Sequence, residues 1–116
     1  MNHRLLFSLV VIGLTSCATV TLAPERLQGA EASIRSAEEL GASNVPKAKL
    51  HVQLAKDQAA QAQKMAKDGD ERAGLVLARA EADAEYALGL AREVAVHADA
   101  LRAAEDLKAV RARTAP

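Results

Sequence analysis

Met65-Ala-Lys-Asp-Gly-Asp-Glu-Arg-Ala-Gly74 is the stretch that decides the fold, because the sequence on its two sides is nearly a mirror image. Gly69 suits the residue just past a helix C-terminus, and a neighbouring Asp suits the cap of the next helix. On both sides small apolar residues alternate spacings of four and three, which is a heptad seam. The first seam is Ala48, Val52, Ala55, Ala59, Ala62 and Ala66, and the second is Ala73, Leu77, Ala80, Ala84, Ala87, Ala91, Val94, Ala98 and Leu101.

The two seams can be paired layer by layer across the turn. Residue numbers that sum to 139 match them from Ala66 with Ala73, beside the turn, to Ala48 with Ala91. Mirror symmetry about a turn is what an antiparallel αα-hairpin requires. The small seam residues further predict that the two backbones approach closely.

A further helix is expected before the hairpin. Pro24 suits the first turn of a helix, and Gly41 suits the position just past its end. Residues 42–46 form a break in which Ser43 or Asn44 can cap the following helix. The sequence therefore predicts an all-α protein with helices at about 24–40, 46–67 and 71–113. The apolar residues of the first helix recur at helical spacing as Leu27, Ala30, Ile34 and Ala37.

The position of this first helix has two solutions. Residues 24–67 and 71–113 have nearly equal lengths, so the first two helices can form one broken arm of an elongated antiparallel hairpin about 65 Å long. In that arrangement Leu40 faces Leu101 and Ile34 faces Leu107. The alternative is a three-helix bundle, which leaves the last helix without a partner after about Val94. We favour the long hairpin.

The composition limits the function classes. Of the 116 residues, 27 are Ala and only Phe7 and Tyr86 are aromatic, so the chain favours long, closely packed helices over a core with a deep pocket. Fifteen basic and fifteen acidic residues are interspersed, which indicates a solvated surface rather than a nucleic-acid interface. We expect one helical domain at 24–113.

The first seventeen residues are typical of a bacterial lipoprotein precursor. Arg4 precedes the apolar stretch 5–14, which matches a signal peptide at 1–16 and is too short to span a bilayer. The segment 14–17 resembles the bacterial lipobox, with Leu14, Thr15, Ser16 and Cys17. The Cys17 thiol is then the nucleophile that takes a diacylglyceryl group in a thioether bond, and cleavage before it frees an amine for acylation.

These features predict a membrane anchor and a tether. Residues 17–23 are expected to form a lipidated tether, and two or three acyl chains such as palmitate would hold it stably. Ala18 follows the cysteine, and the absence of Asp there favours the outer membrane, facing the periplasm. The competing interpretation is ordinary secretion, with cleavage after Ala18 releasing a soluble periplasmic binding or chaperone-like module.

Sites for chemistry are sparse in the sequence. A single cysteine excludes an intramolecular disulfide, and His51 and His97 are too far apart in sequence to indicate a metal site. Glu81, Asp83 and Glu85 are spaced so that they point to different sides of a helix. Tyr86 is expected at the seam edge or near the break. We therefore expect no catalysis, no cofactor, no small-molecule substrate and no nucleic acid.

The run Ala80-Glu-Ala-Asp-Ala-Glu-Tyr-Ala87 resembles a motif in the third helix of the envelope proteins of domain-of-unknown-function family 4398. The Pro24 start and the Gly41 break are also similar, and the resemblance covers about 22–110. Asn44-Val45-Pro46 departs from the family pattern, in which an aromatic residue precedes Ala-Pro. The resemblance implies a Gram-negative lipoprotein or exported protein of unknown activity. Many members carry an OmpA-like peptidoglycan-binding domain; no such segment occurs in these 116 residues, so that activity is not implied.

The most direct functional expectation is therefore a membrane-anchored envelope lipoprotein with a structural or protein-interaction role. Its expected partners are the lipid membrane, through acylated Cys17, and a protein partner or a second copy of the chain. A second apolar stripe on the expected second and third helices consists of Leu50, Leu54, Met65, Val76 and Leu88. They are candidates for contact with the first helix or with another protomer.

Overall fold

Three α-helices and one short 3-10 turn make up the part of the chain that the computed structural model describes, residues 20–115. The helices are α1 (Pro24–Glu39), α2 (Pro46–Lys67) and α3 (Ala73–Thr114), and the 3-10 turn η1 is Ala42–Asn44. These residues include no strand, and each helix boundary lies within two residues of the expected one. The prediction of an elongated all-α protein is confirmed.

The turn between α2 and α3 is built as the sequence indicated. Gly69 has φ of 77°, a left-handed conformation that an L side chain rarely adopts. The Asp70 N–H donates to the Met65 carbonyl at 2.9 Å and the Gly69 N–H to the Ala66 carbonyl at 3.1 Å. This pair of bonds is the Schellman motif, which satisfies carbonyls at a helix end. The chain thereby reverses within a few residues and starts the hairpin.

Asp70 orders the turn just before α3. One of its carboxylate oxygens accepts hydrogen bonds from the backbone N–H of Arg72, at 2.9 Å, and from the Arg72 Nε, at 3.0 Å. The other oxygen accepts from Arg72 Nη2 at 2.7 Å. These hydrogen bonds from Arg72, side chain first, lower the pKa of Asp70 from 3.8 to about 2. The expectation that an Asp at this turn caps α3 is wrong: the cap residue is Arg72, without a side-chain hydrogen bond, and Asp70 instead closes an Asx-type turn just before it.

We expect Asp70→Asn to change the acid stability of the protein. A carboxyl whose folded pKa is depressed stabilises the fold fully above about pH 4 and loses that contribution as the pH falls through about 2. The unfolding free energies of the two proteins should therefore differ most above pH 4 and converge toward pH 2. Urea titrations followed by circular dichroism from pH 5 to pH 2 measure this. A difference that stays constant over that range would contradict the assignment.

The two heptad seams form the core of the hairpin. One buried cluster contains Ala48, Val52 and Ala55 of α2 with Ala84, Ala87 and Ala91 of α3. A second, nearer the turn, contains Ala59 and Ala62 with Leu77 and Ala80. These groupings agree with the mirror pairing, and most of these Ala side chains are fully buried. Since an alanine buries little area, the stability of this core depends on close backbone approach.

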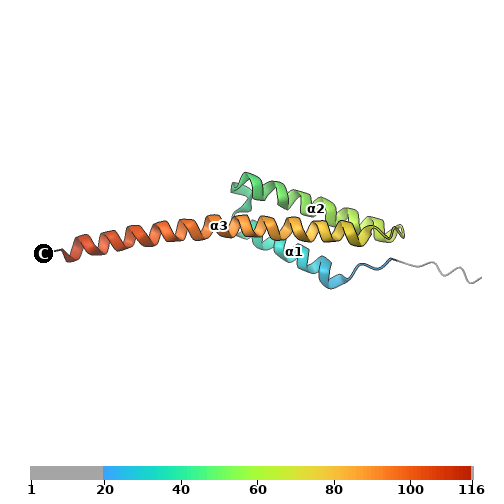
Figure 1. Cartoon of the computed structure of the whole chain (residues 1–116), viewed down its shortest axis with the longest axis horizontal. Helices are drawn as coiled ribbons and strands as arrows, with labels where there is room; N and C mark the ends of the chain where they lie inside the picture. The colour runs from blue at the N-terminus through green and yellow to red at the C-terminus, as the bar shows by residue number, and fades with distance from the viewer. Residues whose placement is uncertain (1–19, 116) are drawn as a thin grey trace, which may run out of the picture.

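The position of α1 corrects the favoured arrangement. α1 folds back on the hairpin and runs beside α3 in the same direction, so the molecule is the three-helix bundle that was the alternative (Figure 1). Ile34 and Ala37 are buried against Ala84 and Ala87, while Leu27 packs near Leu77. Leu40, Leu101 and Leu107, which a long hairpin would pair, are 43%, 55% and 50% exposed.

Two backbone features at the break reverse the chain. Gly41 has φ of 84° and ends α1, as its position in the sequence indicated. Val45 is extended (φ −109°, ψ 104°), the conformation favoured before a proline. Ser43 and Asn44 lie in η1, so the expectation that one of them caps α2 is wrong; the cap residue is Val45, without a side-chain hydrogen bond. Ala42 is fully buried beneath the turn.

α3 continues far beyond the bundle. Its last buried residue is Ala91, and residues 92–114, hereafter the arm, extend as a single helix to the C-terminal side (Figure 1). At 1.5 Å per residue these 23 residues span about 35 Å. The three-helix alternative predicted this unpaired end after about Val94, and Val94 is indeed half exposed.

Candidate functional site

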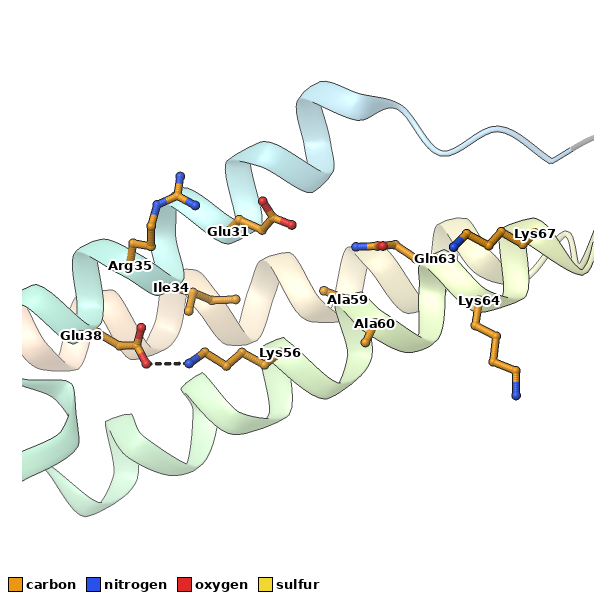
Figure 2. Close-up of a pocket in the computed structure, with 10 residues that line it drawn as sticks. All are labelled: Glu31, Ile34, Arg35, Glu38, Lys56, Ala59, Ala60, Gln63, Lys64 and Lys67. Atoms are coloured by element: carbon orange, nitrogen blue, oxygen red, sulfur yellow. Dashed lines mark hydrogen bonds and ion pairs between the residues drawn. The ribbon is translucent and has the colours of Figure 1, made fainter.

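An open groove lies between α1 and α2, on the side of the bundle where these helices diverge (Figure 2). Ile34 points from α1 toward Ala59, and these two residues with Ala60 give the groove its apolar surface. Its volume is about 450 Å³. The remaining lining residues are charged or polar: Glu31, Arg35, Glu38, Lys56, Gln63, Lys64 and Lys67.

The charges around the groove are mostly basic. Lys56 closes one end by binding Glu38, with 2.6 Å between Nζ and Oε1 (Figure 2). Four lining residues are basic and two are acidic, which leaves an excess of two positive charges. Both members of the Lys56–Glu38 pair are almost half exposed, so the pair orients side chains more than it stabilises the fold. The groove offers an open surface to a binding partner, but its ten lining residues include no Ser, Thr, Cys, His or Tyr nucleophile.

A second polar cluster joins α2 to α3. His51 Nδ1 lies 2.6 Å from Asp83 Oδ1, and Gln58 Nε2 donates to Asp83 Oδ2 at 2.9 Å. A carboxylate only accepts hydrogen bonds, so the Nδ1 of His51 carries a proton in this contact. The His51 ring meets Tyr86 edge to face, with 4.6 Å between centroids, and Lys47 Nζ lies 5.0 Å from the Tyr86 centroid.

The acidic residues before Tyr86, which are Glu81, Asp83 and Glu85, do not form one cluster. Asp83 faces α2, whereas Glu81 faces α1 and binds Arg26, with 2.8 Å between Oε1 and Nε. The carboxylates thus point to different sides, as expected from their spacing. Two of them bond across helices rather than forming only a solvated surface: Glu81 in an ion pair with Arg26, and Asp83 in a hydrogen bond with His51. The hydrogen bond and charge of Glu81 raise the pKa of Arg26. Tyr86 lies at the seam edge, as expected, and is 42% exposed.

The His51–Asp83 contact was not among the contacts predicted from the sequence. A usable signal was present, because each residue directly precedes a seam residue, Val52 or Ala84. Positions that flank a heptad seam form the interhelical polar contacts of coiled coils. His97 belongs to the arm and lies eleven positions further along α3 than Tyr86, the α3 residue that the His51 ring contacts. Within the described residues, no group of three His, Cys, Asp or Glu side chains is placed to hold a metal ion.

The residues predicted to form a lipobox, Leu14, Thr15, Ser16 and Cys17, lie outside the described residues. The chain enters the described region at Val20, and Leu22 packs near Leu77, Ala59 and Ala62. The N-terminal segment therefore reaches the bundle at the end that carries the 68–72 turn, opposite the arm (Figure 1). Within residues 20–115, no helix is both long and apolar enough to cross a membrane.

Comparison with known proteins gives no assignment. No protein-family model matches the sequence, and neither a curated protein nor a solved structure matches it.

Proposed function

We propose that this protein is a lipoprotein of the bacterial cell envelope, anchored through acylated Cys17, with a structural or protein-interaction role and no catalysis of its own. The lipobox at 14–17 and the resemblance to domain-of-unknown-function family 4398 motivate the proposal. Ala18 after the cysteine favours the inner leaflet of the outer membrane, with the helical domain in the periplasm.

The positions of the two ends of the bundle support the proposed interaction role. The N-terminal segment joins the bundle beside the 68–72 turn, and the arm leaves the other end (Figure 1). Two residues, Ala18 and Thr19, lie between Cys17 and Val20, so the Cα atoms of Cys17 and Val20 are at most about 11 Å apart. An acylated Cys17 would hold the turn end near the lipid surface and display the arm away from it. The groove between α1 and α2 would lie in the membrane-proximal half.

The proposal is tested by the intact mass of the full chain extracted from membranes. We expect the wild-type polypeptide to begin at residue 17 and to carry the additional mass of two or three acyl chains. Cys17→Ser should carry no acyl mass, because a hydroxyl does not form the thioether. The matched control is Ser16→Ala, which keeps a small residue before the cysteine and should be acylated like the wild type.

One result would overturn the anchor. If the wild-type protein is recovered wholly in the soluble fraction with an unmodified N-terminus at Thr19, the chain is secreted by cleavage after Ala18. That outcome would support the soluble periplasmic binding or chaperone-like module instead.

A further inference from the structure

The turn end of the bundle carries an apolar surface that nothing in the described chain covers. Leu75 lies there on the first turn of α3 and, at 68%, is the most exposed of the large apolar side chains among residues 20–115. It lines an open hollow of about 440 Å³ together with Met65 and Val76. Apolar side chains that gather on an exposed surface are candidates for contact with another molecule or a membrane.

Basic side chains surround this surface. Arg72 and Arg79 line the same hollow, and Lys64 and Lys67 lie on the last turn of α2. Arg72 binds Asp70, whereas the other three basic residues form no ion pair within residues 20–115. Long basic side chains can lie along an apolar surface while their charged ends reach water or phosphate groups, so they suit the edge of a lipid bilayer.

Acidic residues of the turn nearly balance these charges. Asp68, Asp70 and Glu71 carry three negative charges against the four positive ones, which leaves a net charge of +1 at this end. Attraction to anionic lipids grows with each basic residue near the surface, so it is small here. Contact with a lipid surface would therefore come mainly from the apolar residues and depend little on lipid charge.

The chain that leads to the predicted anchor ends at this same surface. Leu22 packs against the cluster of Ala59, Ala62 and Leu77 beside the turn. Five residues along the chain from Leu22 to Cys17 span at most about 18 Å. An acylated Cys17 would keep the turn end next to the bilayer. A contact between tethered partners is intramolecular, so it forms even where the same contact between free partners is weak.

We propose that the turn end docks directly on the lipid surface, with Leu75, Met65 and Val76 in contact with the bilayer and the arm directed away from it. The inference rests on the anchor proposed for Cys17 and adds a second contact, which fixes the direction of the rod. Burying the exposed part of Leu75 shifts the equilibrium toward the docked orientation by about tenfold.

The expected depth of the contact is small. Apolar side chains of interfacial helices reach about 5–10 Å into the boundary between headgroups and acyl chains. That depth includes the first turn of α3. It excludes Leu50, which lies about 22 Å from Met65 along α2, and the whole of the arm. Docking therefore predicts a steep difference between positions along the rod.

Single-tryptophan variants of the full chain measure this difference. The sequence contains no Trp, so an introduced one is the only source of tryptophan fluorescence. The protein is extracted from membranes and reconstituted in phosphatidylcholine vesicles that contain lipids brominated near the headgroup end of their acyl chains, which quench tryptophan. We expect Leu75→Trp to emit at shorter wavelength and to lose most of its fluorescence. The matched controls Leu50→Trp and Leu107→Trp, which replace leucines that are 56% and 50% exposed, should show neither change.

A second set of variants tests whether Leu75 causes the contact. Met65→Trp keeps an apolar side chain in the hollow and should be quenched in the same vesicles. Adding Leu75→Asp should restore its fluorescence, because a charged side chain replaces the apolar one. Adding Leu50→Asp should leave the quenching unchanged. Equal helix content by circular dichroism shows that these proteins are folded alike, and phosphatidylglycerol in the vesicles should change the quenching little.

The outcomes separate the docking from the anchor. If the intact mass shows acylation but Leu75→Trp is not quenched, the turn end does not dock and the anchor stands. Equal quenching of Leu50→Trp and Leu75→Trp would overturn the orientation, because the bundle would then lie flat. Quenching that requires phosphatidylglycerol would overturn the apolar origin of the contact. A protein without acyl mass would overturn the anchor, and the docking that rests on it.

Discussion

Leu77→Ala is expected to destabilise the protein by about 2–5 kcal/mol, the usual range for removing a fully buried leucine. Leu77 is the only large side chain among the described residues that is completely buried. It lies with Ala59, Ala62 and Ala80 at the turn end of the bundle, where Leu22 and Leu27 also pack. Its alanine neighbours are short and cannot fill the space that the substitution opens.

The effect is large relative to the stability of the whole protein. Native domains unfold with about 5–15 kcal/mol, so this single truncation would remove a substantial fraction. For a helical domain of this size, a loss of 1 kcal/mol lowers the melting temperature by about 4–8 °C. Urea and thermal unfolding followed by circular dichroism would measure both quantities.

Leu75→Ala is the matched control for this prediction. Leu75 lies two residues earlier on the same helix and is 68% exposed. Its truncation should change the unfolding free energy by no more than about 0.5 kcal/mol. Similar losses for the two substitutions would show that Leu77 does not occupy the buried position described above.

Ala84→Leu is expected to destabilise the bundle by the opposite mechanism. Ala84 is fully buried where Ile34 of α1 and Ala55 of α2 meet α3. A leucine there forces the helices apart and costs about 1–3 kcal/mol, even though leucine is a good helix former. We expect the helix content at 25 °C to remain, the midpoint of urea unfolding to fall, and binding of an apolar dye to rise as the helices separate.

Ala82→Leu makes the same chemical change at an exposed position two residues away. It should leave the midpoint nearly unchanged, because no helix lies against that side chain. If Ala82→Leu and Ala84→Leu behaved alike, the close approach of three helices at Ala84 would be wrong. The pair therefore tests the position of α1 as well as the alanine seam.

The helices and their ends followed from local sequence signals. Pro24 and Pro46 begin helices because the first turn does not need their missing N–H, and Gly41 and Gly69 follow helix ends because they adopt positive φ. The α2–α3 pairing followed from the mirrored heptad seams. These properties depend on a few neighbouring residues or on one periodic pattern, so the sequence was sufficient to predict them.

The candidate binding surfaces were less accessible to sequence reasoning. The groove exists only because α1 diverges from α2, and its lining residues come from two helices whose relative placement no local pattern specifies. The His51–Asp83 contact depends on the flanking positions of the seam. By contrast, a lipobox is a linear motif, so the lipidation of Cys17 is predicted from residues 14–17 alone. The intact-mass measurement proposed above tests this prediction.

By itself, the sequence determined an all-α chain with an alanine-seamed hairpin and a break near Pro46. Only the tertiary structure decided where α1 goes. Its apolar stripe suits either arrangement, because Ile34 could pack against Leu107 in a long hairpin or against Ala84 and Leu88 in a bundle. Folding back buries Ile34 and Leu88 together in a three-helix core, which a thin two-helix rod would leave partly in water. The same choice leaves the arm uncovered.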